Sequence, residues 1–209
     1  ANFLGSFLPS SIGVDAVRRA FANHAATVVD DPARSRAAVA LVLRDAAGGP
    51  EVLLIERARH PEDPWSGHRA FPGGRVDPAD SDTRAAAERE TLEEVGLPLA
   101  GAELLGRLDD LEGRHAGRPL QLVISAWVYH VKEHGPLVQN HEVETMLWVP
   151  LTRLVDPRHG VAYPTAVGDF PGILVGEPDR HIVWGLTYRF LELFLERVGH
   201  PLPHRWQSV

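Results

Sequence analysis

Runs of apolar residues separated by turn-forming residues predict a chain in which strands and helices are mixed. Two such runs, 37–43 and 51–55, have the length of buried strands, and the Gly- and Pro-containing loop between them is typical of a hairpin. We expect further strands at 104–111, 121–131 and 144–150. The segment 121–131 is almost continuously apolar, which is typical of a strand covered on both faces of a sheet.

Helical spacing of apolar residues first occurs in 14–24, which predicts a short amphipathic helix. The segment 83–95 is also expected to be a helix, because Ser81 or Asp82 can cap its N-terminus and Gly96 is placed to end it.

A third helix is predicted at 182–198, with an apolar stripe along one face. The stripe consists of Phe190, Leu191, Phe194, Leu195 and Val198. A stripe of this kind usually packs into the core of a globular protein, and a dimer face is the alternative.

Two stretches, 61–78 and 156–180, are rich in Pro and Gly and have little periodicity, so we expect no regular structure there. A loop as long as 156–180 is usually functional or mobile. Its aromatic residues Tyr163 and Phe170 can cover a substrate and stack on a base, or the segment can pack against the domain as a structured insertion.

The mixture of strands and helices predicts an α/β (α+β) fold. The length of 209 residues fits one compact domain, and no change in composition marks a second one. We therefore expect a single domain over 1–209, with an N-terminal helical extension at about 1–35 and a C-terminal helix at about 182–198.

Charge and composition narrow the possible partners. The chain carries 28 acidic against 21 basic residues, a formal charge of −7, which argues against non-specific nucleic-acid binding. An anionic substrate therefore needs a local basic patch or a bridging metal ion. Cysteine is absent, which excludes disulfides, thiolate metal sites and a cysteine nucleophile.

Location and source are also constrained by the sequence. The longest apolar run of the first half, 37–43, is far shorter than a membrane span, and the first residues do not resemble a secretory signal. We expect a cytoplasmic protein without a membrane partner. Lys132 is the single lysine, and the dominance of arginine and alanine indicates a GC-rich, bacterial genome.

The densest acidic cluster lies between 77 and 94. Glu90 and Glu94 are four residues apart and share one face of the predicted helix, and Glu93 borders that face. Crowded carboxylates repel one another, and a divalent cation resolves the repulsion; oxygen ligands favour Mg²⁺ or Mn²⁺. Arg89 can pair with Glu93 one turn away and orient it. A solvated acidic helix face is the alternative.

A glycine turn stands just before this helix, in the stretch Phe71-Pro72-Gly73-Gly74-Arg75. Glycines allow the backbone to approach the helix closely, so that a carbonyl of the turn can supply a further metal ligand. The sequence from Gly74 to Leu97 resembles the signature of the Nudix hydrolase family, G-x5-E-x7-R-E-U-x-E-E-x-G-U, where U is a bulky apolar residue.

The second half of the signature matches well, with Thr91 at a U position as its exception. In the first half the segment from Gly74 to Arg89 is one residue longer, and the early Glu is absent, with Asp80 and Asp82 nearby. The resemblance implies an α/β/α sandwich with a mixed sheet between helices. It also implies metal-dependent hydrolysis in which Arg89 and Glu93 are catalytic. The implied metal ligands are Glu90, Glu93, Glu94 and Gly74.

A second resemblance, to the coenzyme A pyrophosphatase branch of that family, is carried by 52–58 and 67–74, with Ile55 in place of a Thr and an unusual spacer at 59–66. It extends to 140–151 and 184–189. Four residues in or beside these stretches are candidates for substrate binding: Arg57, His68, Arg69 and Phe71. A guanidinium binds phosphate well, although each arginine can equally be a structural or surface residue.

The resemblance implies hydrolysis of a nucleoside diphosphate linked to another group, with no covalent enzyme intermediate. The expected substrate is coenzyme A or a thioester of it, giving 3′,5′-ADP and 4′-phosphopantetheine. The alternatives are ADP-ribose, NADH or a dinucleoside polyphosphate, and a module that senses a nucleotide without catalysis. We expect a small nucleotide-like partner and a monomer or homodimer.

The identity of the general base stays open. Glu93 is one candidate, and a distal loop carboxylate is the other, for which Glu142 and Glu144 are available. His141 and Glu142 begin like the zinc motif H-E-x-x-H, but the second His is absent, so zinc proteolysis is rejected.

Overall fold

The computed structural model describes residues 12–206 except 64, 116 and 117. The first eleven residues of the expected N-terminal extension therefore lie outside the described residues. In the described part, that extension contains one helix, α1 (Val14–Phe21).

In the part of the chain that the structure describes, the centre of the molecule is a mixed sheet of eight strands. Its main path runs β3-β2-β1-β7-β5, with β4 on β1, β6 on β7 and β8 on β2. Strand β1 is parallel to β7, and the other pairs are antiparallel. The strands are β1 (Ser35–Arg44), β2 (Glu51–Arg57), β3 (Arg69–Ala70), β4 (Gly73–Arg75), β5 (Glu103–Arg107), β6 (Leu111–His115), β7 (Arg118–Val131) and β8 (Val143–Pro150).

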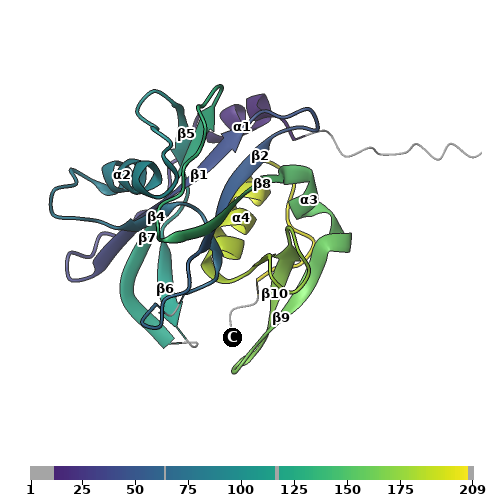
Figure 1. Ribbon diagram of the computed structural model, residues 1–209. Coiled ribbons are helices and arrows are strands. Elements are labelled where there is room, and N and C mark those ends of the chain that lie inside the picture. Colours follow the sequence, from purple (N-terminus) through teal and green to yellow (C-terminus); the bar gives the residue numbers. More distant parts are fainter. Residues whose placement is uncertain (1–11, 64, 116–117, 207–209) are drawn as a thin grey trace, which may run out of the picture.

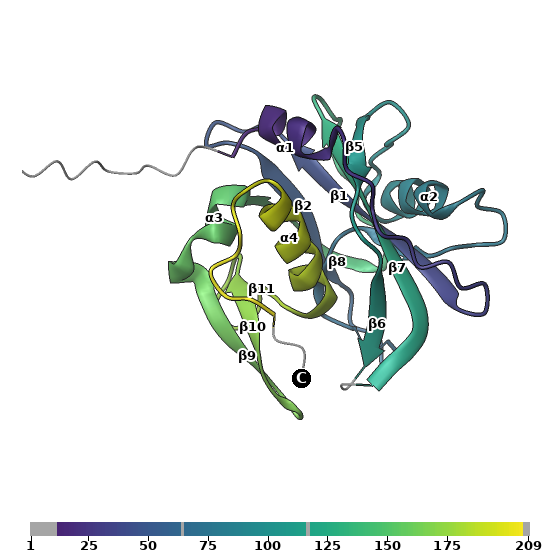
Figure 2. The same ribbon diagram turned by 180° about the vertical axis from the view of Figure 1, so that it is seen from behind.

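Helices cover both faces of this sheet (Figure 1, Figure 2). Helix α2 (Thr83–Val95) packs on one face, where Ala40 and Val42 of β1 point, and α4 (Gly185–Arg197) and α1 pack on the other, where Leu41 points. A short helix, α3 (Leu151–Val155), follows β8. The expected sandwich with a mixed sheet between helices is therefore confirmed.

Local signals set the bounds of α2 as predicted. The side chain of Asp82 accepts a hydrogen bond from the Ala85 amide at 2.8 Å, and Gly96 ends the helix in the left-handed conformation with φ of 68°. Such caps satisfy backbone groups that the helix itself leaves unpaired.

The stripe of the C-terminal helix packs in the core, as expected. Phe190, Leu191, Phe194 and Leu195 are all at most 2% exposed. The helix itself begins later than predicted, at Gly185, because residues 182–183 form a strand. Among the described residues no helix is long and apolar enough to cross a membrane.

The prediction that 156–180 lacks regular structure is wrong. After a 3-10 turn (Pro157–His159), β9 (Gly160–Thr165) and β10 (Gly168–Leu174) form a hairpin, and β11 (Ile182–Val183) extends it to a second sheet. The hairpin projects from the body of the molecule (Figure 1). Prolines at 164 and 171 obscured the strand pattern, since proline lacks a backbone donor and is tolerated in strands only at edges.

Two further expectations needed correction. The stretch 61–78 contains two short strands, β3 and β4, which join the main sheet through β2 and β1. The single strand predicted at 104–111 is in fact β5, which ends at Arg107, followed by the first residue of β6. Short strands of two to five residues are too brief to show a period in the sequence.

Candidate metal centre

The glycine turn holds the carboxylate of Glu94 in the interior. Glu94 is only 2% exposed, and its Oε2 accepts a hydrogen bond from the Gly73 amide at 2.9 Å. Gly73 leaves the turn to pair with Val39 of β1, which fixes the turn against the sheet. One turn earlier on α2, the half-buried Glu90 rests against Gly74, where an added Cβ would lie 2.5 Å from its Oε1.

A third carboxylate reaches this place from the turn just before β8. Carboxylate oxygens of Glu90, Glu94 and Glu142 all lie within 4.8 Å of one another. The segment that carries Glu142 is held to α2, because the Asn140 amide donates to the Glu94 carbonyl at 2.9 Å and the Asn140 side chain accepts from the Glu142 amide at 2.9 Å. We call this group the carboxylate cluster.

Arg89 ties the loop before α2 to the helix. Its guanidinium donates to both carboxylate oxygens of Asp80 at 3.0 Å, to Glu90 at 3.0 Å and to Glu93 at 3.1 Å. It also donates to the Arg75 carbonyl beside the glycine turn. Sequence reasoning expected the pair with Glu93, and it missed Asp80, which is the bidentate partner nine residues away.

Glu93 and Glu144, two of the predicted site residues, lie outside the carboxylate cluster. The side chain of Glu93 is 53% exposed and faces Arg89. Glu144 is exposed and lies where the register of β8 against β2 shifts. Such a bulge interrupts the usual alternation of side chains, so the spacing of two residues from Glu142 does not bring Glu144 into the cluster. Gly74, whose carbonyl is the other predicted ligand, borders the Glu90 carboxylate and pairs with Ala38 of β1.

Arg57 and His68 lie on the segment beside the cluster. The Arg57 guanidinium pairs with Asp63 at 2.9 Å and also acts electrostatically on Glu94, whose pKa it lowers against the effect of burial. The ring of His68 meets the ring of Trp184 edge-on, with centroids 5.2 Å apart.

Arg69 and Phe71, two of the expected substrate-binding residues, point into the interior instead. Arg69 is 3% exposed and pairs with the buried Glu56 at 3.1 Å, and Phe71 is 2% exposed in the core. Glu56 also binds Thr145 of β8 and Arg180. A buried arginine needs such partners, and through them Arg69 joins strands β2, β3 and β8 to the 177–181 segment.

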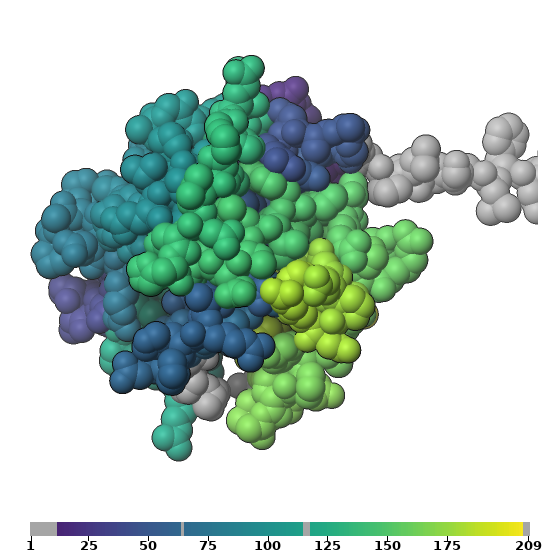
Figure 3. All heavy atoms as spheres, in the orientation of Figure 1, coloured from purple at the N-terminus to yellow at the C-terminus, as the bar shows by residue number. Residues whose placement is uncertain are grey.

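At the surface above this buried network, the 58–68 segment lies next to residues 175–181 (Figure 3).

Two aromatic residues of the hairpin pack on tryptophans outside it. Tyr163 stacks on Trp184 with ring centroids 4.2 Å apart, and Phe170 stacks on Trp206 with ring centroids 4.8 Å apart. The reading of this segment as a packed insertion is thus the one that the contacts favour.

Burial makes the carboxylate cluster unfavourable by itself. Desolvation raises the pKa of Glu94 to about 8, against an ordinary value of 4.5, although the Gly73 amide and Arg57 oppose the shift. Desolvation also raises the pKa of Glu90, opposed by Arg89. Carboxylates that are costly to ionise and converge on one point have the oxygen donors that Mg²⁺ or Mn²⁺ requires, so the residues fit a divalent cation.

The raised pKa of Glu94 predicts how stability depends on pH. The folded protein keeps a proton on Glu94 that the unfolded chain releases near pH 4.5. In the presence of a chelator, the protonated Glu94 contributes to the free energy of unfolding. This contribution is fully present below about pH 4.5 and is lost as the pH rises through about 8. The slope from this one group is at most about 1.4 kcal/mol for each pH unit.

Chemical denaturation between pH 5 and 9 checks this expectation, with the Glu94→Gln variant as the control that lacks the titrating group. Saturating Mn²⁺ should flatten the dependence, because the cation favours the ionised form. An equal slope in wild type and variant would contradict the assignment to Glu94.

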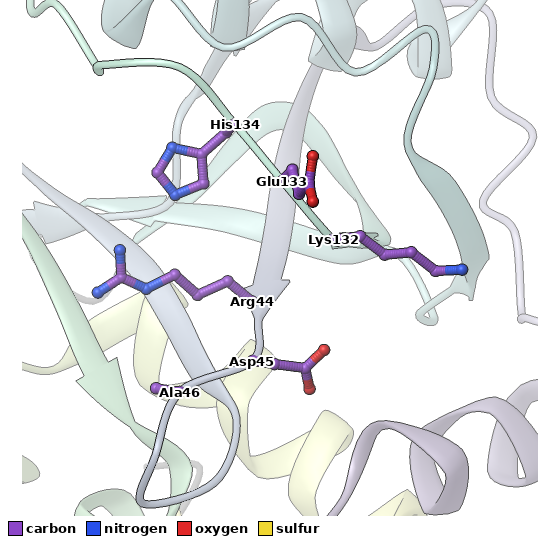
Figure 4. Close-up of a pocket in the computed structure, with 6 residues that line it drawn as sticks. All are labelled: Arg44, Asp45, Ala46, Lys132, Glu133 and His134. Carbon is purple, nitrogen blue, oxygen red and sulfur yellow. The ribbon is translucent and has the colours of Figure 1, made fainter.

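A separate hollow lies at the far ends of β1 and β7 (Figure 4), and it contains none of the predicted site residues. It is lined by Arg44, Asp45, Ala46, Lys132, Glu133 and His134. Arg44 lies five residues beyond Val39 along β1, about 17 Å at the usual strand rise. The hollow is therefore apart from the carboxylate cluster.

Comparison with known proteins identifies relatives of this chain. The model of the NUDIX domain matches residues 34–166. An uncharacterized Nudix hydrolase, NudL, of Citrobacter koseri is 30% identical over 79% of this chain and 84% of its own length. An uncharacterized protein of Schizosaccharomyces pombe is 39% identical over 52% of this chain, and the matched region spans about a third (34%) of that protein.

Among solved structures, a MutT/nudix family protein from Enterococcus faecalis has a similar fold, with a TM-score of 0.56. The two are 19% identical over 82% of this chain and 64% of the other. At this identity the similarity concerns the fold alone.

Proposed function

The chain belongs to the NUDIX domain family, and we propose that it is a metal-dependent pyrophosphohydrolase that cleaves the diphosphate of a nucleotide-like substrate. The observation that carries this proposal is the carboxylate cluster of Glu90, Glu94 and Glu142. Of these, Glu90 and Glu94 would hold the divalent cation, Mg²⁺ or Mn²⁺, and Glu142 borders the place where it would lie. When bound, the cation neutralises phosphate charge and orients water.

The chain's own residues hold the carboxylates of the site in place. The Gly73 amide and the packing of Gly74 fix the two helix carboxylates, so that little reorganisation is needed when substrate binds. Arg89, which Asp80 holds in place, donates directly to Glu90, and this makes Arg89 a positioning residue in the proposal. Arg57, part-exposed beside the cluster, is the cation best placed for a phosphate oxygen.

Two carboxylates remain candidates for the base that accepts the proton of water. Glu142 is favoured because it is exposed and its carboxylate lies in the cluster. Glu93 is the alternative; it lies outside the cluster and donor groups of Arg89 engage it.

The proposed substrate is coenzyme A or one of its thioesters, on the strength of the sequence resemblance in 52–58 and 67–74. ADP-ribose, NADH and dinucleoside polyphosphates are the competing substrates. A non-catalytic nucleotide sensor is the second candidate function, and the retained carboxylates and Arg89 disfavour it.

A substrate panel tests the function. Purified protein with Mg²⁺ or Mn²⁺ should hydrolyse coenzyme A to 3′,5′-ADP and 4′-phosphopantetheine, faster than it hydrolyses ADP-ribose, NADH or diadenosine tetraphosphate. Products are identified by chromatography and mass spectrometry, with chelator as the control. Faster turnover of another panel member would reassign the substrate, and the absence of metal-dependent turnover on every member would contradict the enzyme proposal.

A further inference from the structure

Arg189 on α4 is half-buried and lacks a partner in the part of the chain that the structure describes. Within 12–206, with 64, 116 and 117 set aside, its guanidinium makes no hydrogen bond and no ion pair. An arginine that is partly removed from water usually has a counter-charge, because burying an uncompensated cation is costly. Burial accordingly lowers the pKa of Arg189.

The charged groups around Arg189 do not compensate it. Of the charged groups that act on Arg189, Arg114 of β6 has the largest effect and is itself a cation, and Glu192 and Glu112 act in the opposite sense. Glu112 binds Arg34 at 2.6 Å, and the Glu192 carboxylate accepts a hydrogen bond from the Trp206 amide at 2.7 Å. Both carboxylates are therefore engaged by other donors, and the two arginines lie on elements that pack against each other, α4 and β6.

The start of α4 connects this place to the carboxylate cluster. Thr187 donates a hydrogen bond to the Arg69 carbonyl at 3.0 Å, and Trp184 contacts His68. Arg69 opens β3, which leads within four residues to Gly73. Arg189 lies two residues beyond Thr187, and the first turns of α4 run beside β6 (Figure 2). The start of α4 is thus joined through Arg69 to the strand that leads to the cluster.

We propose that Arg189 and Arg114 bind a phosphate monoester of the substrate, distinct from the diphosphate that is cleaved. Guanidinium groups match the geometry of phosphate oxygens, and a dianion would offset both cations at once. The inference rests on the proposed function and deepens it. Coenzyme A carries such a phosphate on its ribose, whereas ADP-ribose and NADH carry none, so the pair would select among the substrates of the panel.

Two substrates that differ by this phosphate test the pair. Arg189→Gln should lower kcat/KM for coenzyme A about 10- to 100-fold, chiefly through KM, and change that for dephospho-coenzyme A less than about threefold. Arg197→Gln, an exposed arginine on the same helix, is the matched control and should leave both unchanged. Arg189→Lys keeps the charge and should recover part of the discrimination. An equal loss on both substrates would overturn the proposal.

Binding without turnover separates this site from the proposed function. In calorimetry without metal, wild type should bind adenosine 3′,5′-bisphosphate at least tenfold more tightly than AMP, and Arg189→Gln should bind the two alike. Selective binding by an inactive wild type would support the site while contradicting the hydrolase. Equal binding of the two nucleotides by wild type would overturn the site whether or not the enzyme is active.

Discussion

Replacing Glu94 by Gln should lower kcat/KM for the preferred substrate at least about a thousandfold, a loss of some 4 kcal/mol in transition-state stabilisation. The amide keeps the size of the side chain and can still accept the hydrogen bond of the Gly73 amide. It removes the charge that the divalent cation needs from the most buried member of the carboxylate cluster. Steady-state kinetics at saturating Mg²⁺ and Mn²⁺ give the ratio.

Stability separates this effect from unfolding. Because desolvation penalises the ionised Glu94, the variant should be at least as stable as wild type in the presence of chelator at pH 8. Glu133→Gln, an exposed glutamate of the far hollow, should retain full activity. In the same assay Glu142→Gln should lose more activity than Glu93→Gln if Glu142 is the base. Near-normal turnover by Glu94→Gln would refute the role of the cluster.

Alanine at the two adjacent glycines should have opposite consequences. At Gly73, with φ of 156°, a Cβ would press on the Ala38 carbonyl and lie 2.6 Å from Val39 Cα, both backbone atoms of β1. Strain and overpacking should cost about 2–4 kcal/mol of unfolding free energy. At Gly74 the Cβ would meet the Glu90 carboxylate at 2.5 Å, and that side chain can move away.

Gly74→Ala should therefore fold with nearly normal stability and lose about a hundredfold in kcat/KM, since Glu90 is displaced from the cluster. Thermal unfolding and kinetics on the two variants check the contrast, with Gly48→Ala as a control, because a Cβ there meets nothing within 4 Å. If Gly74→Ala were unstable and Gly73→Ala stable, the account of the turn would fail.

Local signals let the sequence predict α2 and the pair Glu90 and Glu94, because capping and the four-residue spacing act within one segment. The sequence named Glu142 as a candidate but could not place it in the cluster. Its position depends on hydrogen bonds between residues 138–140 and the end of α2. The motif around Arg69 indicated nearness to the site, but not that its side chain turns inward.

That orientation comes from Glu56 and the 180 segment, which lie 13 and 111 positions away in the chain. The hairpin of β9 and β10 was missed for a related reason. Its stability derives from packing on Trp184 and Trp206 near the C-terminus rather than from a periodic pattern of its own.

Titration of the protein with Mn²⁺, followed calorimetrically for wild type, Glu94→Gln and Glu133→Gln, tests the central claim most directly. If the carboxylate cluster is the metal centre, wild type and Glu133→Gln should bind the cation alike, and Glu94→Gln should bind it at least about a hundredfold more weakly. Equal Mn²⁺ affinity in wild type and Glu94→Gln would contradict the claim and place the metal elsewhere.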